Sequence, residues 1–161
     1  MRELLLKING NKKITTSLNI ISHASALLCV AIYAVAVCLA FTAELKVLVG
    51  ILFFAGAPFV LVSMIRRIID APRPYEVYEF YEDTKGKRAG QSFPSRHVFS
   101  AFVIATLTLC VSVPLGIVAF ALGISLAVSR VLLGLHFVRD VTAGAIIGVL
   151  FGLLGILIIL I

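Results

Sequence analysis

Long apolar runs without a charged residue constrain this chain more than any other feature. The runs cover residues 18–43, 47–65, 98–129 and 141–161. A helix needs about 20 apolar residues to cross the hydrocarbon core of a bilayer. The run 98–129 is too long for one crossing, and the Val-Pro-Leu-Gly turn at 113–116 divides it into two helices. The sequence therefore predicts an all-α, polytopic membrane bundle with about five transmembrane helices.

The composition agrees with a membrane protein and excludes several other classes. Hydrophobic residues make up 61% of the 161 positions, and charged residues make up 14%. A soluble domain carries about 25% charged residues, so a soluble globular enzyme is excluded, and disordered chains are far less hydrophobic. The net charge of +6 lies at the ends of the apolar runs, which favours membrane lipids or an anionic substrate over nucleic acid. We expect a single membrane-embedded domain over residues 1–161.

Two short polar stretches are expected to lie at the membrane interface. Basic residues surround a brief apolar stretch within residues 1–17, and the Asn-Gly-Asn sequence at 9–11 interrupts any helix there. Tyr75, Tyr78 and Tyr81 recur every third residue between acidic residues. This spacing predicts a short amphipathic helix or loop with its tyrosines at headgroup depth.

Three polar segments contain residues that could bind a ligand or take part in catalysis. The first of them follows the second apolar run. Pro72 and Pro74 flank Arg73, and Arg66 stands one residue beyond the run. A residue before proline disfavours helical backbone, so the helix must end near Asp70 and Arg73 is held stiffly. Rigid guanidinium groups suit bidentate contacts with phosphate oxygens. The alternative is a basic membrane edge that touches lipid headgroups.

The second segment, residues 92–97, opens the third apolar run. Its serines and proline fit a helix N-terminus, where free backbone N–H groups attract an anion. Ser95 adds a hydroxyl donor, and His97 adds an acid. The alternative is a capping turn with an incidental histidine.

The third segment places Ser129 and Arg130 ahead of His136 and Asp140. His136 and Asp140 are four residues apart, so they share a face on a helical turn. A carboxylate that contacts one imidazole nitrogen fixes the tautomer and leaves the other nitrogen basic. This arrangement suits a nucleophile or a base, and a structural His–Asp contact is the alternative.

The segments share one membrane face, because two apolar runs separate the charged patches. Their charges are mainly arginines, and no group of carboxylates is placed to hold a divalent metal. We therefore expect no metal or other cofactor, with the arginines supplying the positive charge. The pattern favours metal-independent phosphoryl transfer through a histidine.

The three segments resemble the signature of the type 2 phosphatidic acid phosphatase (PAP2) superfamily. That signature reads Lys-x6-Arg-Pro, then Pro-Ser-Gly-His, then Ser-Arg-x5-His-x3-Asp. The matching residues fall in segments 66–74, 94–97 and 129–140. The resemblance implies a membrane phosphatase whose substrate is a lipid phosphate: phosphatidic acid, phosphatidylglycerophosphate, or a polyprenyl phosphate or diphosphate.

The resemblance also implies a role for each matching residue. His136 would be the nucleophile and form a phosphohistidine, Asp140 would orient it, and His97 would protonate the leaving alkoxide and later activate water. The remaining matching residues would bind the phosphate, namely Arg66, Arg73, Ser95, Arg96 and Arg130. Arg66 replaces the usual lysine. Arg96 replaces the usual glycine, so it must point away from the phosphate or join the site and favour a more anionic headgroup.

Two other functions fit part of this pattern. A non-catalytic membrane protein would bind anionic lipid headgroups in the same basic pocket, but binding does not need an oriented nucleophile. Vanadate-binding haloperoxidases belong to the same superfamily, but they resemble soluble helical proteins. The apolar runs argue against that branch.

The distribution of Lys and Arg predicts the orientation in the cell membrane. Outside the signature, nine of them lie on the side of the N-terminus and the signature segments, and Lys46 alone lies on the other side. Short loops rich in Lys and Arg stay in the cytoplasm, so the site is expected to face it. Gly144, Gly148 and Gly152 form a small-residue face that suits helix packing, and it is also a candidate surface for a homo-oligomer.

Overall fold

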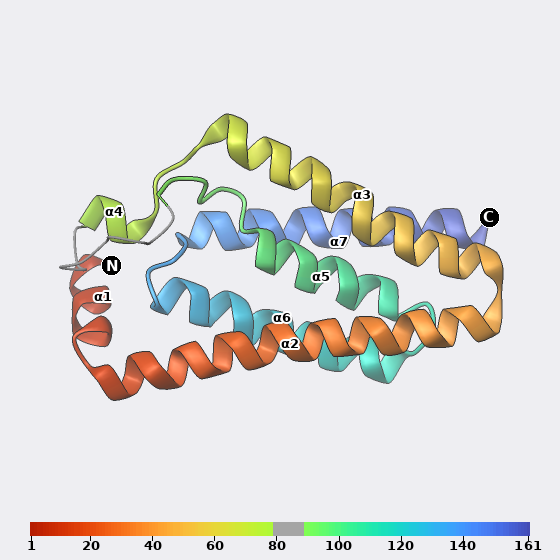
Figure 1. Ribbon diagram of the computed structural model, residues 1–161, viewed down its shortest axis with the longest axis horizontal. Helices are drawn as coiled ribbons and strands as arrows, with labels where there is room; N and C mark the ends of the chain where they lie inside the picture. The colour runs from red at the N-terminus through yellow and green to blue at the C-terminus, as the bar shows by residue number, and fades with distance from the viewer. Residues whose placement is uncertain (79–88) are drawn as a thin grey trace.

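The computed structural model describes residues 1–78 and 89–161, and the regular structure in these ranges is helical (Figure 1). The helices follow in the order α1 (Arg2–Asn9), α2 (Lys12–Ala43), α3 (Leu45–Ile69), α4 (Pro74–Tyr78), α5 (Arg96–Thr108), α6 (Val113–Leu132) and α7 (Val138–Leu160). The prediction of an all-α polytopic bundle is confirmed.

Four helices among the described residues are long and apolar enough to cross a membrane: α2, α3, α6 and α7. The fifth expected span, α5, has 13 residues. At 1.5 Å per residue it is about 20 Å long, shorter than the roughly 30 Å hydrocarbon core. The non-helical residues 89–95 precede it. The count of five full-length spans is therefore reduced to four long helices and one short one.

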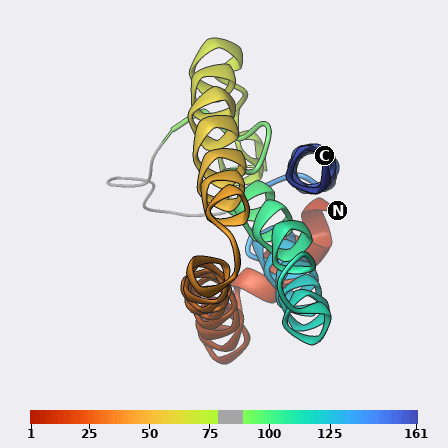
Figure 2. The ribbon, with the colours of Figure 1, turned by 90° about the vertical axis from the view of Figure 1, so that its right-hand side faces the viewer.

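The short helix α5 is the centre of the bundle. It contacts each of the four long helices, and an end view shows it close to α3, α6 and α7 (Figure 2). Most of its residues are buried. Because protein surrounds α5, the non-helical backbone before it is tolerated as long as its polar groups are hydrogen-bonded.

The glycine face of α7 packs against α5. A Cβ atom on Gly144 would lie 2.6 Å from the carbonyl oxygen of Ser95, and one on Gly148 would lie 2.6 Å from that of Phe99. Only glycine permits this approach of two backbones. The face considered for a homo-oligomer is thus occupied within the chain, and an oligomer would need another surface.

The turn between α5 and α6 lies earlier than the sequence indicated. The helix α5 ends at Thr108, residues 109–112 form the turn, and Pro114 stands in the first turn of α6. Proline fits there because the N–H groups in the first turn of a helix have no acceptor within the helix, so the lack of an N–H group costs no hydrogen bond.

The N-terminus and the signature segments lie at the same end of the bundle (Figure 1). The predicted interruption at residues 9–11 separates α1 from α2, and the Asn11 side chain accepts hydrogen bonds from the N–H groups of Lys13 and Ile14. The Asn9 side chain donates to the carbonyl of Leu132 at the end of α6, 3.2 Å away. Since α2 then runs the length of the bundle, Lys46 lies at the opposite end.

The predicted interfacial helix is described in part. The helix α4 contains Tyr75 and Tyr78, whereas Tyr81 lies outside the described residues. Tyr75 is buried rather than placed at an exposed interface. This end of α4 is therefore packed against the protein.

Candidate active site

The first signature segment begins in the last turn of α3. The helix ends at Ile69, and Asp70 follows with a left-handed backbone at φ 42°, which confirms the predicted helix end. The Asp70 side chain accepts a hydrogen bond from the N–H of Gln91 at 3.1 Å, and the Ala71 carbonyl accepts one from the N–H of Ser92 at 2.8 Å. These bonds pair the first signature segment with residues 91 and 92.

A glutamate completes this pairing. The Glu76 carboxylate accepts hydrogen bonds from the N–H groups of Arg73 at 3.1 Å and Gly90 at 2.8 Å. The Arg73 Nε atom in turn donates to the Gly90 carbonyl at 3.0 Å. Gly90 has φ 64°, a conformation that glycine adopts without strain. Glu76, which the sequence places in an interfacial helix or loop, thus helps to hold Arg73.

The Arg66 side chain forms hydrogen bonds to the loop before α5. It is 6% exposed, and its Nη1 atom donates to the carbonyls of Ser92, at 3.3 Å, and Pro94. The same guanidinium group was expected to bind phosphate. That role stays a prediction, and the observed contacts show that Arg66 also orders the second signature segment.

Three buried polar atoms of the signature lack a hydrogen-bond partner among the described residues. Two are donors, the Oγ atom of Ser95 and the Nε atom of Arg130, and the third is the acceptor Oδ1 of Asp140. The Ser95 backbone is fixed, since its N–H donates to the Asp140 carbonyl at 2.8 Å. Buried polar groups are nearly always paired, so two unpaired donors at one site indicate room for a polar ligand.

The third segment turns sharply between α6 and α7. The Arg130 carbonyl accepts hydrogen bonds from the N–H groups of Leu135 at 3.0 Å and His136 at 3.3 Å, and Gly134 has φ 65°. His136 is buried in this turn. Asp140 lies in the first turn of α7, where its Oδ2 atom accepts a hydrogen bond from the Phe137 N–H at 2.9 Å.

His136 and Asp140 are close, but they do not share a helix as expected. His136 precedes α7, and its Nδ1 atom lies 3.8 Å from the Oδ2 atom of Asp140. Burial lowers the pKa of His136 below its ordinary value, as do the charges of Arg73 and Arg66, whereas the Asp140 carboxylate opposes them. The imidazole is therefore neutral at pH 7, which is the nucleophilic form.

Sequence reasoning did not identify Ser92 as a site residue. Its side chain is fully buried, and its Oγ atom lies 2.5 Å from Asp140 Oδ2 and 3.3 Å from His136 Nδ1. No spacing in the sequence connects Ser92 with residues more than 40 positions later. The one sequence signal for a role of Ser92 in the site was its position two residues before the Pro94–Ser95 pair.

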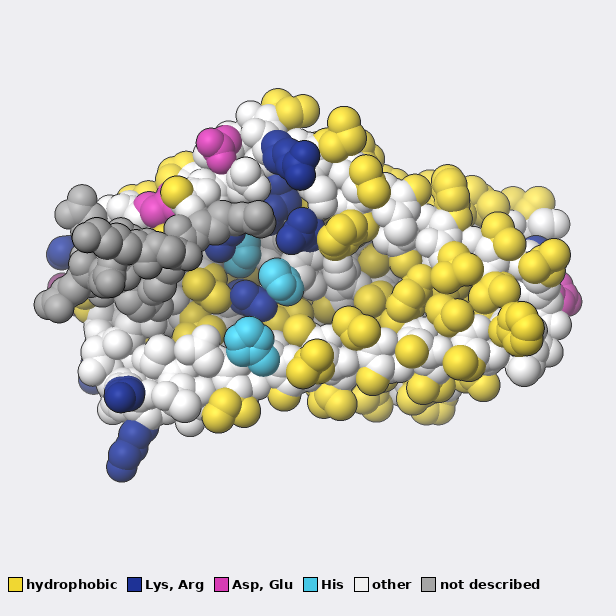
Figure 3. Space-filling view, viewed as in Figure 1, with side chains coloured by type: hydrophobic (Ala, Val, Ile, Leu, Met, Phe, Trp, Pro, Cys, Tyr) yellow, Lys and Arg dark blue, Asp and Glu magenta, His cyan; other side chains and the backbone are white. Residues whose placement is uncertain are grey.

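The histidines and arginines of the three segments come together. His97 interacts electrostatically with four of them, namely Arg66, Arg96, Arg130 and His136, and Arg130 interacts with Arg73. Lys, Arg and His side chains gather around a hollow near the end that carries α4, while much of the same face is hydrophobic (Figure 3). Within residues 1–78 and 89–161, no three His, Cys, Asp or Glu side chains are placed to hold a metal ion.

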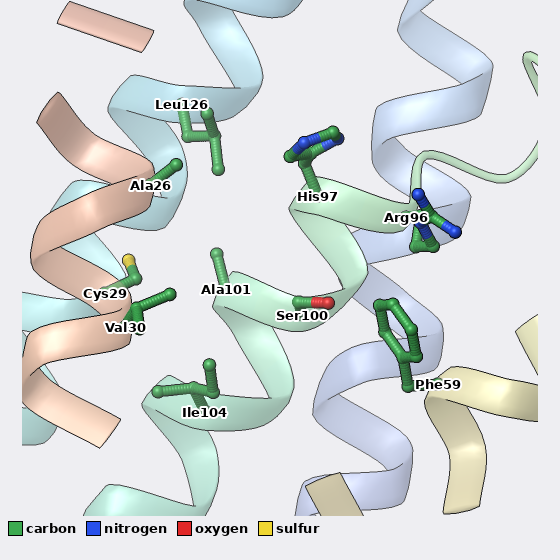
Figure 4. A pocket seen from close by; sticks show the side chains of 10 residues that line it. All are labelled: Ala26, Cys29, Val30, Phe59, Arg96, His97, Ser100, Ala101, Ile104 and Leu126. Carbon is green, nitrogen blue, oxygen red and sulfur yellow. The ribbon is translucent and has the colours of Figure 1, made fainter. Parts of the chain in front are cut away.

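A pocket of about 220 Å³ adjoins this cluster (Figure 4). Arg96 and His97 lie at one end of it, in the first turn of α5, and the guanidinium of Arg96 stands over the ring of Phe59 at 5.2 Å from the centroid. The other lining residues are mostly apolar and come from α2, α5 and α6: Ala26, Cys29, Val30, Ser100, Ala101, Ile104 and Leu126. The site thus has a buried cationic part and an apolar part that opens between helices.

The sequence model of the PAP2 superfamily matches residues 27–160. The chain belongs to the PAP2 superfamily. None of the curated protein sequences matches it. Among solved structures, LpxE from Aquifex aeolicus is similar at 21% identity, with 96% of this chain and 93% of that chain covered and a TM-score of 0.71. This likeness confirms the fold.

A second solved structure is a PAP2-type phosphatidylglycerolphosphate phosphatase from Bacillus subtilis. It has 24% identity, with 96% of this chain and 90% of that chain covered and a TM-score of 0.42.

In this PAP2 chain, Arg96 follows Ser95 as the first residue of α5. Its helical backbone accepts a side chain, and the guanidinium is directed to Phe59.

Proposed function

We propose that this chain is an integral-membrane lipid phosphatase that works through a phosphohistidine and without a metal ion. The observation that carries the proposal is the buried His136, flanked by Asp140 and near the signature arginines. His136 interacts electrostatically with His97, which lines the apolar pocket. A non-catalytic headgroup-binding protein would need the arginines but not the neutral, oriented imidazole.

The reaction divides into two displacements. The Nε2 atom of His136 attacks phosphorus, an N–P bond forms, and the P–O bond to the lipid breaks. Desolvation and the charges of Arg130, His136, Arg96 and Arg66 lower the pKa of His97 to about 3, and the negative charge of a bound phosphate would raise it again. Protonated His97 donates its proton to the leaving oxygen, so that a phosphate monoester releases an alcohol and a lipid diphosphate releases a lipid monophosphate. His97 then removes a proton from water, whose oxygen attacks phosphorus and breaks the N–P bond, which releases inorganic phosphate and restores His136.

The charges around the phosphate would stabilise both displacements. Arg73 and Arg130, with Arg66, would neutralise the oxygens of the transferring group, and Ser95 would donate its unpaired hydroxyl hydrogen. The apolar pocket beside His97 suits the chain of a lipid. Phosphatidic acid, phosphatidylglycerophosphate and polyprenyl phosphates or diphosphates are the proposed substrates.

Phosphate release in detergent tests the proposal. The purified protein should release phosphate from at least one of these lipids in EDTA, and vanadate should inhibit it because vanadate adopts the five-coordinate geometry of the transferring group. Substrate labelled with ³²P should leave an acid-labile label on the wild-type protein. Binding without turnover of any of these lipids would favour the headgroup-binding protein, and strict magnesium dependence would refute the metal-independent mechanism.

We also propose that the site faces the cytoplasm. Nine basic residues outside the signature support this orientation: Arg2, Lys7, Lys12, Lys13, Arg67, Lys85, Lys87, Arg88 and Arg139. Against them stands Lys46 at the other end. Such a bias retains the richer side in the cytoplasm.

Cysteine labelling in intact cells tests this orientation. The native cysteines at 29, 38 and 110 are first replaced, and Lys87→Cys and Lys46→Cys are compared. A membrane-impermeant maleimide should react with the cysteine at 46 and spare the one at 87. The opposite pattern would show an outward-facing site.

A further inference from the structure

Ser92 lies between the imidazole of His136 and the carboxylate of Asp140. Its side chain has no exposed surface. Its Oγ atom is 3.3 Å from His136 Nδ1 and 2.5 Å from Asp140 Oδ2, whereas Nδ1 and Oδ2 are 3.8 Å apart. A nitrogen–oxygen separation of 3.8 Å is too long for a hydrogen bond, whereas one of 3.3 Å lies close to the usual upper limit of about 3.2 Å. The hydrogen-bonded path from the imidazole to the carboxylate therefore runs through the serine hydroxyl.

The chemistry of the three groups fixes the direction of the hydrogen bonds. An ionised carboxylate only accepts, so the Ser92 hydroxyl donates its single hydrogen to Asp140. The Ser92 oxygen can then only accept from His136, which requires the hydrogen of the imidazole to be on Nδ1. The lone pair is left on Nε2, the atom that attacks phosphorus in the proposed function.

The backbone on both sides holds this hydroxyl in place. The Ser92 N–H donates to the Ala71 carbonyl at 2.8 Å, and the Ser92 carbonyl accepts from Arg66 at 3.3 Å. Asp140 Oδ2 also accepts from the Phe137 N–H at 2.9 Å. Groups from the first and third signature segments thus converge on one serine.

We propose that Ser92 is a positioning residue for the nucleophile, and that its hydroxyl links the Asp140 carboxylate to Nδ1 of His136. This role rests on the proposed function of His136. Ser92 touches neither the phosphate nor the reacting nitrogen. It sets the tautomer and the ring orientation of His136, so its loss lowers the rate of phosphohistidine formation and leaves substrate binding intact.

Kinetics of three variants test the role. A hydrogen bond to a charged group contributes enough that Ser92→Ala should lower kcat by about ten- to a hundredfold with KM nearly unchanged, and Ser92→Thr, which keeps the hydroxyl, should recover most of the rate. Thr108→Val is the matched control, because it removes a buried hydroxyl that bonds the Ile104 carbonyl near the far end of α5. It should keep wild-type activity.

A double-mutant cycle separates positioning from general packing. In the Asp140→Asn background the Ser92→Ala change should cost little, because both residues act through the same nitrogen. If the double variant lost activity by the full product of the fold-losses in kcat of the two single variants, the proposal would be overturned. Equal losses in Ser92→Ala and Ser92→Thr would also overturn it.

Nuclear magnetic resonance of ¹⁵N-histidine protein in detergent gives a readout without substrate. His136 should carry its hydrogen on Nδ1 in the wild type and move toward the Nε2–H tautomer in Ser92→Ala. An unchanged tautomer in a folded Ser92→Ala protein would refute the link. If His136→Ala proved active, the proposed function would fail, but the tautomer result would still stand on its own.

Discussion

On one side of the candidate site, His136 and Asp140 are buried and lie within a network of short hydrogen bonds to Ser92 and the backbone. On the other side, His97 is exposed, and Arg96 contacts the ring of Phe59 beside an apolar pocket. The residues of the first side are held by hydrogen bonds to buried side-chain and backbone atoms. The second side has room for a ligand. We therefore expect changes on the buried side to alter rate and changes on the pocket side to alter substrate preference.

Replacing the nucleophile should have the largest effect. We expect His136→Ala to reduce turnover by at least about 10⁵-fold, as removal of a covalent nucleophile does in other enzymes. Phosphate release and ³²P labelling of the protein measure it, with circular dichroism in detergent as the check of folding. A folded variant with near-normal turnover would end the proposed mechanism.

Changing the carboxylate partner should cost less. We expect Asp140→Asn to lower kcat roughly a hundred- to ten-thousand-fold, since it disturbs the tautomer and leaves the nucleophile present. The Asp140 carboxylate raises the pKa of His136, so its removal lowers that pKa further. The acidic limb of the kcat/KM profile should therefore move to lower pH, and a shift to higher pH would contradict this assignment.

Filling the pocket should separate long lipids from small substrates. Ser100 lines the pocket one turn beyond Arg96, and Ser100→Leu should lower kcat/KM for a long-chain lipid phosphate about tenfold, the scale of an overpacked apolar site. A short-chain soluble phosphate should be hydrolysed as before. Thr42→Leu, at the exposed far end of α2, is the control and should affect neither substrate.

The smallest effect is expected at Arg96. Arg96→Gly should leave turnover of a monophosphate lipid intact and reduce preference for a diphosphate about two- to fivefold, in line with one partly exposed charge. Arg96→Lys keeps the charge and should preserve the preference. Equal kcat/KM ratios for the wild type and Arg96→Gly across the lipid panel would show that the guanidinium serves packing against Phe59 alone.

Local rules predicted much of the fold and failed at specific places. The end of α3 at Ile69 followed from two prolines, and the break before α2 followed from residues 9–11. The turn before α6 was placed too late, because Pro114 is compatible with the first turn of a helix as well as with a break. The length of α5 was also overestimated, since apolarity alone does not say where a buried helix ends.

The sequence by itself determined the membrane bundle, the three signature segments and the set of charged residues in them, because hydropathy, proline and motif spacing are local properties. Tertiary structure decided how these residues meet. It placed Ser92 between His136 and Asp140, gave Arg66 the loop carbonyls as partners, and turned the glycine face of α7 onto α5. Such contacts join residues far apart in the chain, and they depend on how closely whole helices pack, which no local pattern encodes.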